Sequence, residues 1–264
     1  MPAASSFLHF VLVETSATYR AKRKENTTMK YFQVIKDLIP LLEREEEHMK
    51  QAGHLMAQSI MNGGIIQAFG SGHSYAASIE IAGRAGGLLP AKAVMEETFG
   101  RYETIEGVGT KFIESWDLRE KDCVVIISNS GRNPFIIEMA SFVKSKNVPL
   151  IAVTALEVSK NSTSRHSSGK RLFELADVVL DNHSVPGDAA VEIEGLYTKV
   201  GGTSSIAADL LLNQTVVFAI EEMLANNFEP PVLMSANIDG GPEFNDKLKE
   251  KYRDLYGYRT WINK

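Results

Sequence analysis

The sequence predicts an α/β fold in which an open parallel sheet of about five strands is flanked by helices. Two observations support this prediction. Short apolar segments alternate along the chain with longer helical patterns. Hydroxyl-rich turns follow two of the apolar segments, at 70–74 and 128–133. Because ligands of open parallel sheets bind outside the carboxyl ends of the strands, we expect a binding site at these turns.

Composition and charge exclude several classes of protein. The chain has 264 residues, of which 44% are hydrophobic and 23% are charged, as in ordinary globular proteins. Its formal net charge of −5 provides no basic surplus for nucleic acid or a membrane surface. No run reaches the ~18 apolar residues of a membrane span. The single cysteine, Cys123, indicates a reducing compartment, so we expect a cytoplasmic protein.

The first residues differ from the rest of the chain. The apolar run 7–13 precedes the basic cluster 20–24, which is the reverse of a signal peptide. Met29 resembles a natural start, so we interpret 1–28 as a disordered or artefactual extension. The remainder, 29–264, is expected to form a single domain with an N-terminal helix and a C-terminal helical tail.

The N-terminal helix is predicted from Tyr31 to Ile60, where apolar residues recur on one face. Pro40 should divide it into a short first piece and a longer second piece. We interpret the acidic residues that follow Pro40 as a solvated face; they are Glu43, Glu45, Glu46 and Glu47. Asn62-Gly63-Gly64 ends the helix.

Apolar segments bounded by glycine or polar residues are the predicted strands. They are 65–69, 91–95, 123–127, 148–154 and 176–180. Helices are predicted among them at 75–85, 112–116 and 135–146. The stretch 157–170 is rich in Ser, Thr, Lys and Asn, so we expect an exposed loop there.

The last long helix is predicted at 206–226 and is apolar on all sides. Such a helix is expected to be buried deeply, in the core or in a subunit interface. Together with the first helix it offers more nonpolar surface than one sheet face needs, so we expect a homodimer or homotetramer. A final helix is predicted at 245–255 within the polar C-terminal region.

Two turns have the composition of a phosphate site. The first, 70–74, reads Gly-Ser-Gly-His-Ser, but Tyr75 stands where a dinucleotide-binding fingerprint has its third glycine. This weakens the interpretation as a nucleotide-binding oxidoreductase without excluding it. The second turn, 128–133, precedes a helix, where the dipole favours an anion. Together the serines and Asn133 provide neutral donors that could hold a phosphomonoester without a lysine or a metal.

The second turn, Ser128-x-Ser130-Gly131-x-Asn133, resembles the Ser/Thr-x-Ser-Gly-x-Ser/Thr phosphate loop of the sugar isomerase (SIS) domain family, with an asparagine at its last position. The first turn resembles that family's first loop. This resemblance covers about residues 31–226 and implies a flavodoxin-like three-layer fold that binds a phosphorylated sugar. The implied binding residues are Ser71, Gly72, His73, Ser74, Ser128, Ser130, Gly131, Asn133 and Ser204. Within the family, the chain is similar to uncharacterised bacterial SIS proteins and, less closely, to phosphoheptose isomerase.

Aldose–ketose isomerisation needs a base that moves a proton between two carbons, and a second acid/base for the oxygens. Residues 80–84 resemble the context of the catalytic glutamate in phosphoheptose isomerases, which makes Glu80 the candidate base. The structural alternative is an i,i+4 ion pair between Glu80 and Arg84 on an exposed face. His183 follows a predicted strand and is the candidate second acid/base, or else a loop histidine with a backbone partner. The reserve bases are Glu96 and Glu97.

We therefore expect a phosphosugar-binding protein, and more specifically a sugar-phosphate isomerase of the phosphoheptose-isomerase type. Acidic residues near His183 lack the tight spacing of metal ligands, so neither a metal nor another cofactor is predicted. Two alternatives remain open, a lyase or etherase acting on an amino-sugar phosphate at the same site, and a non-catalytic phosphosugar sensor. The roughly 30 residues before the first strand are too few and too acidic for the DNA-binding domain that a sensor would usually carry.

Overall fold

A five-stranded parallel sheet forms the centre of the computed structural model, which describes residues 29–254. The strands lie in the order β2-β1-β3-β4-β5. Their bounds are β1 Ile66–Gly70, β2 Ala91–Val94, β3 Cys123–Ile127, β4 Leu150–Thr154 and β5 Val178–Asp181. This confirms the predicted open parallel sheet. The strand order reverses between β1 and β3, and such a switch point is where ligands bind in doubly wound sheets.

The central strands are buried from end to end. All five residues are buried in each of β1, β3 and β4, which explains why they read as continuous apolar runs. Gly70 at the end of β1 pairs with Ile127 at the end of β3. The two hydroxyl-rich turns therefore begin side by side.

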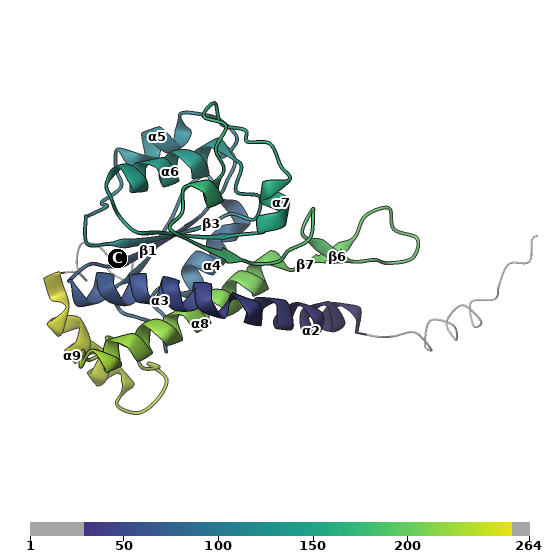
Figure 1. Cartoon of the computed structure of the whole chain (residues 1–264). Helices are drawn as coiled ribbons and strands as arrows, with labels where there is room; N and C mark the ends of the chain where they lie inside the picture. The colour runs from purple at the N-terminus through teal and green to yellow at the C-terminus, as the bar shows by residue number, and fades with distance from the viewer. Residues whose placement is uncertain (1–28, 255–264) are drawn as a thin grey trace, which may run out of the picture.

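Helices cover both faces of the sheet, which gives the molecule three layers (Figure 1). One face carries α2 (Lys30–Leu42), α3 (Glu46–Met61), α4 (Tyr75–Glu80) and α8 (Ser204–Ala225). The other carries α5 (Val108–Ile113) and α6 (Pro134–Ser145), packed on aromatic residues such as Phe69 and Phe135. The remaining helices are α7 (Leu156–Lys160) and α9 (Gly241–Lys251), with 3₁₀ turns η1 (Glu43–Glu45), η2 (Gly72–Ser74) and η3 (Leu172–Glu174). None of the helices within 29–254 is both long and apolar enough to cross a bilayer.

A two-stranded hairpin projects from the body beside α2 (Figure 1). It consists of β6 (Ala189–Val191) and β7 (Val200–Gly202), which pair antiparallel. The hydroxyl of Tyr31 on α2 donates to the Gly202 carbonyl at 2.6 Å. The hairpin and the start of α2 are therefore attached to each other.

The predicted division of the N-terminal helix is confirmed, but it lies beyond Pro40. Pro40 stands inside the last turn of α2, and the helix is interrupted by η1. This 3₁₀ turn brings Glu45 to the protein interior, where it is only 8% exposed. The expected solvated face is therefore wrong for Glu45, although Glu43, Glu46 and Glu47 are exposed.

Several other boundaries differ from the prediction. The helix expected at 75–85 ends at Glu80, because Gly83 and Gly86 adopt the left-handed conformation, with φ of 69° and 78°. The expected loop at 157–170 begins with α7. The final helix, α9, starts at Gly241 rather than at 245. The interpretation of 1–28 concerns residues outside the described part of the chain.

Deep burial of α8 is confirmed for only part of its surface. Leu211 and Leu212 are buried against the sheet-side core. By contrast, Leu210, Val217 and Leu224 are 43%, 44% and 60% exposed. Because these three residues are spaced by seven, they form one apolar stripe along the helix.

Candidate functional site

The two predicted turns are tight, and glycine is required in each. A Cβ atom added to Gly70 would lie 2.4 Å from the Ser74 carbonyl oxygen. In the second turn, Gly131 has φ of +59°, and an added Cβ would lie 3.1 Å from the Thr154 hydroxyl. The sequence therefore folds each turn closely against its own backbone or against the end of β4, at the switch point of the sheet.

The second turn, residues 128–133, presents the start of α6. The Gly131 N–H donates to Ser128 Oγ at 3.2 Å, and the Ala155 N–H donates to the Asn129 carbonyl at 3.0 Å. Asn133 is the N-cap residue of α6, yet its side chain makes no capping hydrogen bond. In the first turn of this helix of 12 residues, Pro134 has no N–H and the Phe135 N–H donates to the Glu103 carbonyl at 3.3 Å. The helix dipole would therefore attract an anion, while the groups of the turn would bond it.

Two arginines add positive charge at the second turn, Arg132 within it and Arg165 beside it, and the sequence interpretation assigned a role to neither. Arg165 Nη1 donates to Asn133 Oδ1 at 2.9 Å. Arg132 Nη2 donates to Thr163 Oγ1 at 3.1 Å. The loop after α7 thus brings positive charge to a site that we expected to be neutral. Arg165 is 32 residues from Asn133 in a stretch without periodicity, so no sequence signal connected the two.

In the first turn, Ser71 has an unusual environment. Its side chain is only 8% exposed, and Oγ has no hydrogen-bond partner among residues 29–254. An unpaired buried hydroxyl is costly, which is typical of an atom that bonds to a ligand or to water. His73 in the same turn is exposed, and its Nε2 lies 3.4 Å from Ser205 Oγ at the start of α8.

A loop held by Glu96 lies against the first turn. Glu96 accepts hydrogen bonds from the N–H groups of Thr98 and Gly100, both at 2.7 Å. An added Cβ on Gly100 would lie 3.0 Å from the Gly72 Cα atom, so the loop and the turn are in close contact. Glu96, a reserve candidate for the base, thus organises this loop, while Glu97 is exposed.

The start of α8 is bonded to a carboxylate of the same chain. Asp188 accepts the N–H groups of Thr203 and Ser204 at 2.9 and 2.8 Å, and the Ser204 hydroxyl at 2.8 Å. Burial alone would raise the pKa of Asp188, but these hydrogen bonds outweigh it and lower the pKa below its usual value. Ser204, an expected phosphosugar-binding residue, is therefore engaged by Asp188 in this structure.

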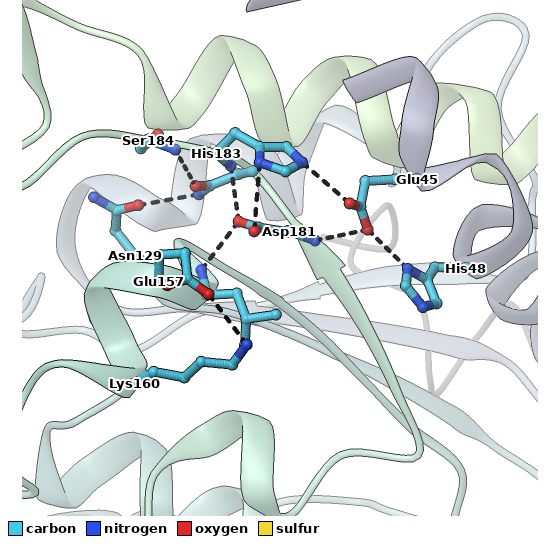
Figure 2. Close-up of polar contacts among 10 residues, drawn as sticks. Glu45, His48, Asn129, Glu157, Lys160, Asp181, His183 and Ser184 are labelled. Carbon is cyan, nitrogen blue, oxygen red and sulfur yellow. Dashed lines mark hydrogen bonds and ion pairs between the residues drawn. The ribbon is translucent and has the colours of Figure 1, made fainter. Parts of the chain in front are cut away.

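His183 lies between two carboxylates at the end of β5 (Figure 2). Its Nε2 is 3.0 Å from Glu45 Oε1, and its Nδ1 is 3.4 Å from Asp181 Oδ2. Asp181 Oδ1 also accepts the His183 N–H at 2.9 Å, which fixes a backbone with φ of +51°. Glu45 additionally bonds His48 Nδ1 at 2.8 Å. The imidazole is thus held by side chains as well as by its own backbone.

Asn182 connects this cluster to the second turn. Its Nδ2 donates to Asn129 Oδ1 at 3.0 Å, and its Oδ1 accepts the Ser184 N–H at 3.0 Å (Figure 2). Ser184 Oγ in turn accepts a hydrogen bond from Thr203 Oγ1 at 3.2 Å. The structure therefore brings His183 and the start of α8 to the edge that carries the two turns.

Glu80 is not brought to this edge within one chain. It forms the i,i+4 ion pair with Arg84 and accepts a hydrogen bond from Asn213 Nδ2 at 3.2 Å. Asn213 follows Ser204 by nine residues on α8, which corresponds to ~13 Å along the helix axis.

A different carboxylate, Asp209, lies between these positions on α8. Its Oδ1 is buried without a hydrogen-bond partner in the described part of the chain. Burial raises the pKa of Asp209 above its usual value, although Arg84 opposes the shift. Asp209 is one helical turn from Ser205, which contacts His73. Its position in an apolar helix gave no sequence signal apart from the i,i+4 spacing to Ser205.

Comparison of the sequence with known proteins identifies its relatives. Residues 30–155 match the SIS domain family. The chain is 54% identical over 225 residues to a UPF0309 protein of Listeria monocytogenes, covering 85% of this chain and 96% of that protein. It is 39% identical over 233 residues to a UPF0309 protein of Halalkalibacterium halodurans, covering 84% and 93%.

Among solved structures, the fold is similar to that of a phosphoheptose isomerase from Francisella tularensis. The TM-score is 0.52 at 16% sequence identity, and the match covers 76% of this chain and 98% of that chain. At this identity the likeness concerns the fold, and the arrangement of the sheet and helices is that of a SIS domain.

Proposed function

Because the chain belongs to the UPF0309 family of SIS-domain proteins, whose fold binds phosphosugars, we propose that it is a sugar-phosphate isomerase with its site at the carboxyl edge of the sheet. The observation that carries the proposal is the uncapped start of α6 beside the serines of the second turn. The dipole of α6, together with the hydroxyls and backbone N–H groups of the turn itself, is suited to the oxygens of a phosphomonoester. Arg165, at 2.9 Å from Asn133, adds a positive charge to this edge.

Isomerisation removes a proton from one of carbons C1 and C2 and returns it to the other through an enediol, so the substrate and product have the same composition. His183 is the candidate for moving the proton between the two oxygens. Its ring nitrogens lie 3.0 and 3.4 Å from the carboxylates of Glu45 and Asp181, so one of these contacts must open for the ring to reach the substrate. The base has two candidates, Glu80 from the sequence pattern and Asp209 from its buried, unpaired oxygen.

The phosphate site is tested by a thermal-shift screen of sugar phosphates, followed by measurement of Kd for each ligand found. Ser130→Ala should weaken binding of every phosphorylated ligand by about 10-fold or more, because a hydrogen bond to a charged group is lost. Ser145→Ala is the matched control, since Ser145 is exposed at the opposite end of the same helix. Equal affinities of Ser130→Ala and the wild type would place the phosphate elsewhere.

The isomerase activity is tested by incubating the bound sugar in deuterated water. We expect deuterium at C1 or C2, and loss of this exchange on replacing the base by its amide, in Glu80→Gln or Asp209→Asn. Tight binding without exchange would contradict the isomerase and leave the lyase or sensor alternatives. Release of an acid or alcohol from the sugar would then identify the lyase or etherase.

A further inference from the structure

Asn133 occupies the position where the SIS phosphate loop has Ser or Thr, and this change has a chemical consequence. A hydroxyl can donate to an anion in any orientation of its group. An amide has two different ends, because its NH₂ donates to a phosphate while its carbonyl oxygen repels one. An asparagine can therefore replace the hydroxyl only if its amide is held in the correct orientation.

A hydrogen bond from Arg165 fixes the orientation of the Asn133 amide. Asn133 is 7% exposed, and its Oδ1 accepts the hydrogen bond from Arg165 Nη1 at 2.9 Å. Its Nδ2 makes no capping hydrogen bond to α6. The guanidinium has no acceptor, so it can bind only the carbonyl end of the amide. This leaves the NH₂ group as the free donor at the start of α6.

The backbone of Arg165 is itself attached to the second turn. Its N–H donates to the Arg132 carbonyl at 2.9 Å, directly before Asn133 in the chain. Thr163 Oγ1 accepts a hydrogen bond from Arg132 Nη2 at 3.1 Å, and the Leu172 N–H donates to the Gly131 carbonyl at 2.8 Å. The loop that carries Arg165 is thus bonded to the second turn both before and after Arg165.

We propose that Arg165 is a positioning residue, which holds the Asn133 carbonyl so that the Asn133 NH₂ group faces the phosphate of the substrate. This inference rests on the proposed binding of a phosphorylated sugar. In this chain the pair of Asn133 and Arg165 replaces the single hydroxyl of the family motif. Arg165 therefore acts through Asn133 rather than by contact with the ligand.

The test is a double-mutant cycle that uses inorganic phosphate and a sugar phosphate as probes. Arg165→Met should raise Kd about 10-fold in the wild-type background, because the amide is free to turn its oxygen to the anion. In an Asn133→Ser background, whatever its own affinity, Arg165→Met should raise Kd several-fold less than in the wild type, because a hydroxyl needs no orientation and only the attraction of the Arg165 charge is lost. A similar loss in both backgrounds would overturn the proposal and indicate direct contact or a structural role.

A second measurement, by NMR, tests the positioning role directly and does not rely on affinities that misfolding of a variant could change. The Asn133 side-chain NH₂ resonances should shift on addition of phosphate in the wild type and lose that shift in Arg165→Met. Unchanged shifts in the variant would contradict the positioning role. If the wild-type chain binds neither phosphate nor any sugar phosphate, the proposed function fails together with this inference, whereas equal losses in the cycle refute the inference alone.

Discussion

Single side chains determine what chemistry the proposed phosphosugar site can perform. Glu45 is the clearest case, because it joins the N-terminal helices to the end of β5. It contacts His183 across 138 residues of sequence, and it is nearly buried. A carboxylate at this distance orients the imidazole.

We predict that Glu45→Gln lowers the rate of solvent-deuterium exchange by about 10-fold or more, because the charge that supports His183 is removed. The Kd for the sugar phosphate should change little, since Glu45 contacts neither turn. Glu46→Gln is the matched control, as Glu46 is an exposed neighbour that pairs with Lys50. Parallel losses of exchange and of binding would mean that Glu45 only maintains the structure.

At the scale of single residues, the sequence was sufficient to predict the place of some residues and not of others. The serines and glycines of the turns could be predicted because each turn is local. Glu45, Arg165 and Asp209 could not, because their partners or surroundings come from distant parts of the chain. A glutamate in an acidic run looks solvated until a 3₁₀ turn directs it inward.

Among the elements, α8 combines two carboxylates in opposite situations. Asp188 is bonded to the positive end of the helix, while Asp209, in its second turn, is only partly exposed and its buried Oδ1 has no partner among residues 29–254. The pKa of Asp188 is lowered and that of Asp209 is raised, each from an ordinary value of 3.8. Ionised Asp188 therefore stabilises the fold at neutral pH, and ionised Asp209 destabilises it.

Removing each charge should change the free energy of unfolding in opposite directions. Asp188→Asn should cost about 1 kcal/mol at pH 7, the size of a typical N-cap contribution, and this cost should shrink as the pH falls through the lowered pKa. Asp209→Asn should stabilise at pH 7, and the gain should disappear below pH 3.8, where the folded and unfolded chains both hold the proton. Urea titrations at pH 7 and pH 3 measure both effects. A destabilised Asp209→Asn variant at pH 7 would show that its carboxylate has an unidentified partner.

The elements themselves were largely predictable. All five strands follow from short apolar runs, because buried parallel strands need no alternation. The end of α4 could not be predicted from the apolar pattern, because two glycines end the helix earlier than that pattern indicates. The short helix α7 was hidden in a polar stretch, where composition indicates a loop.

For the whole molecule, the apolar stripe on α8 is a nonpolar surface along a long helix that one chain leaves exposed. Leu210, Val217 and Leu224 lie on the side of the helix away from the sheet-side core. Burying such a stripe removes nonpolar surface from water, at roughly 25 cal/mol per Å². The expected homodimer or homotetramer would use this surface.

We predict that Val217→Glu lowers the molecular mass measured by light scattering, because a charge in the stripe would be buried without a partner. Ser145→Glu, an exposed change on the opposite face of the sheet, should leave the mass unchanged. A monomeric wild-type chain, or an unchanged mass for Val217→Glu, would contradict this assignment of the interface.

The contact between Glu45 and His183 also has a consequence for the order in which the site forms. The first turn, 70–74, closes over a few residues at the end of β1, whereas the second also depends on hydrogen bonds from Ala155, Arg165 and Leu172. The bond between Glu45 and His183 spans 138 residues and needs β5 in place at the edge of the sheet. Since the entropy of closing a loop grows with its length, we expect the first turn to form before the histidine cluster is complete.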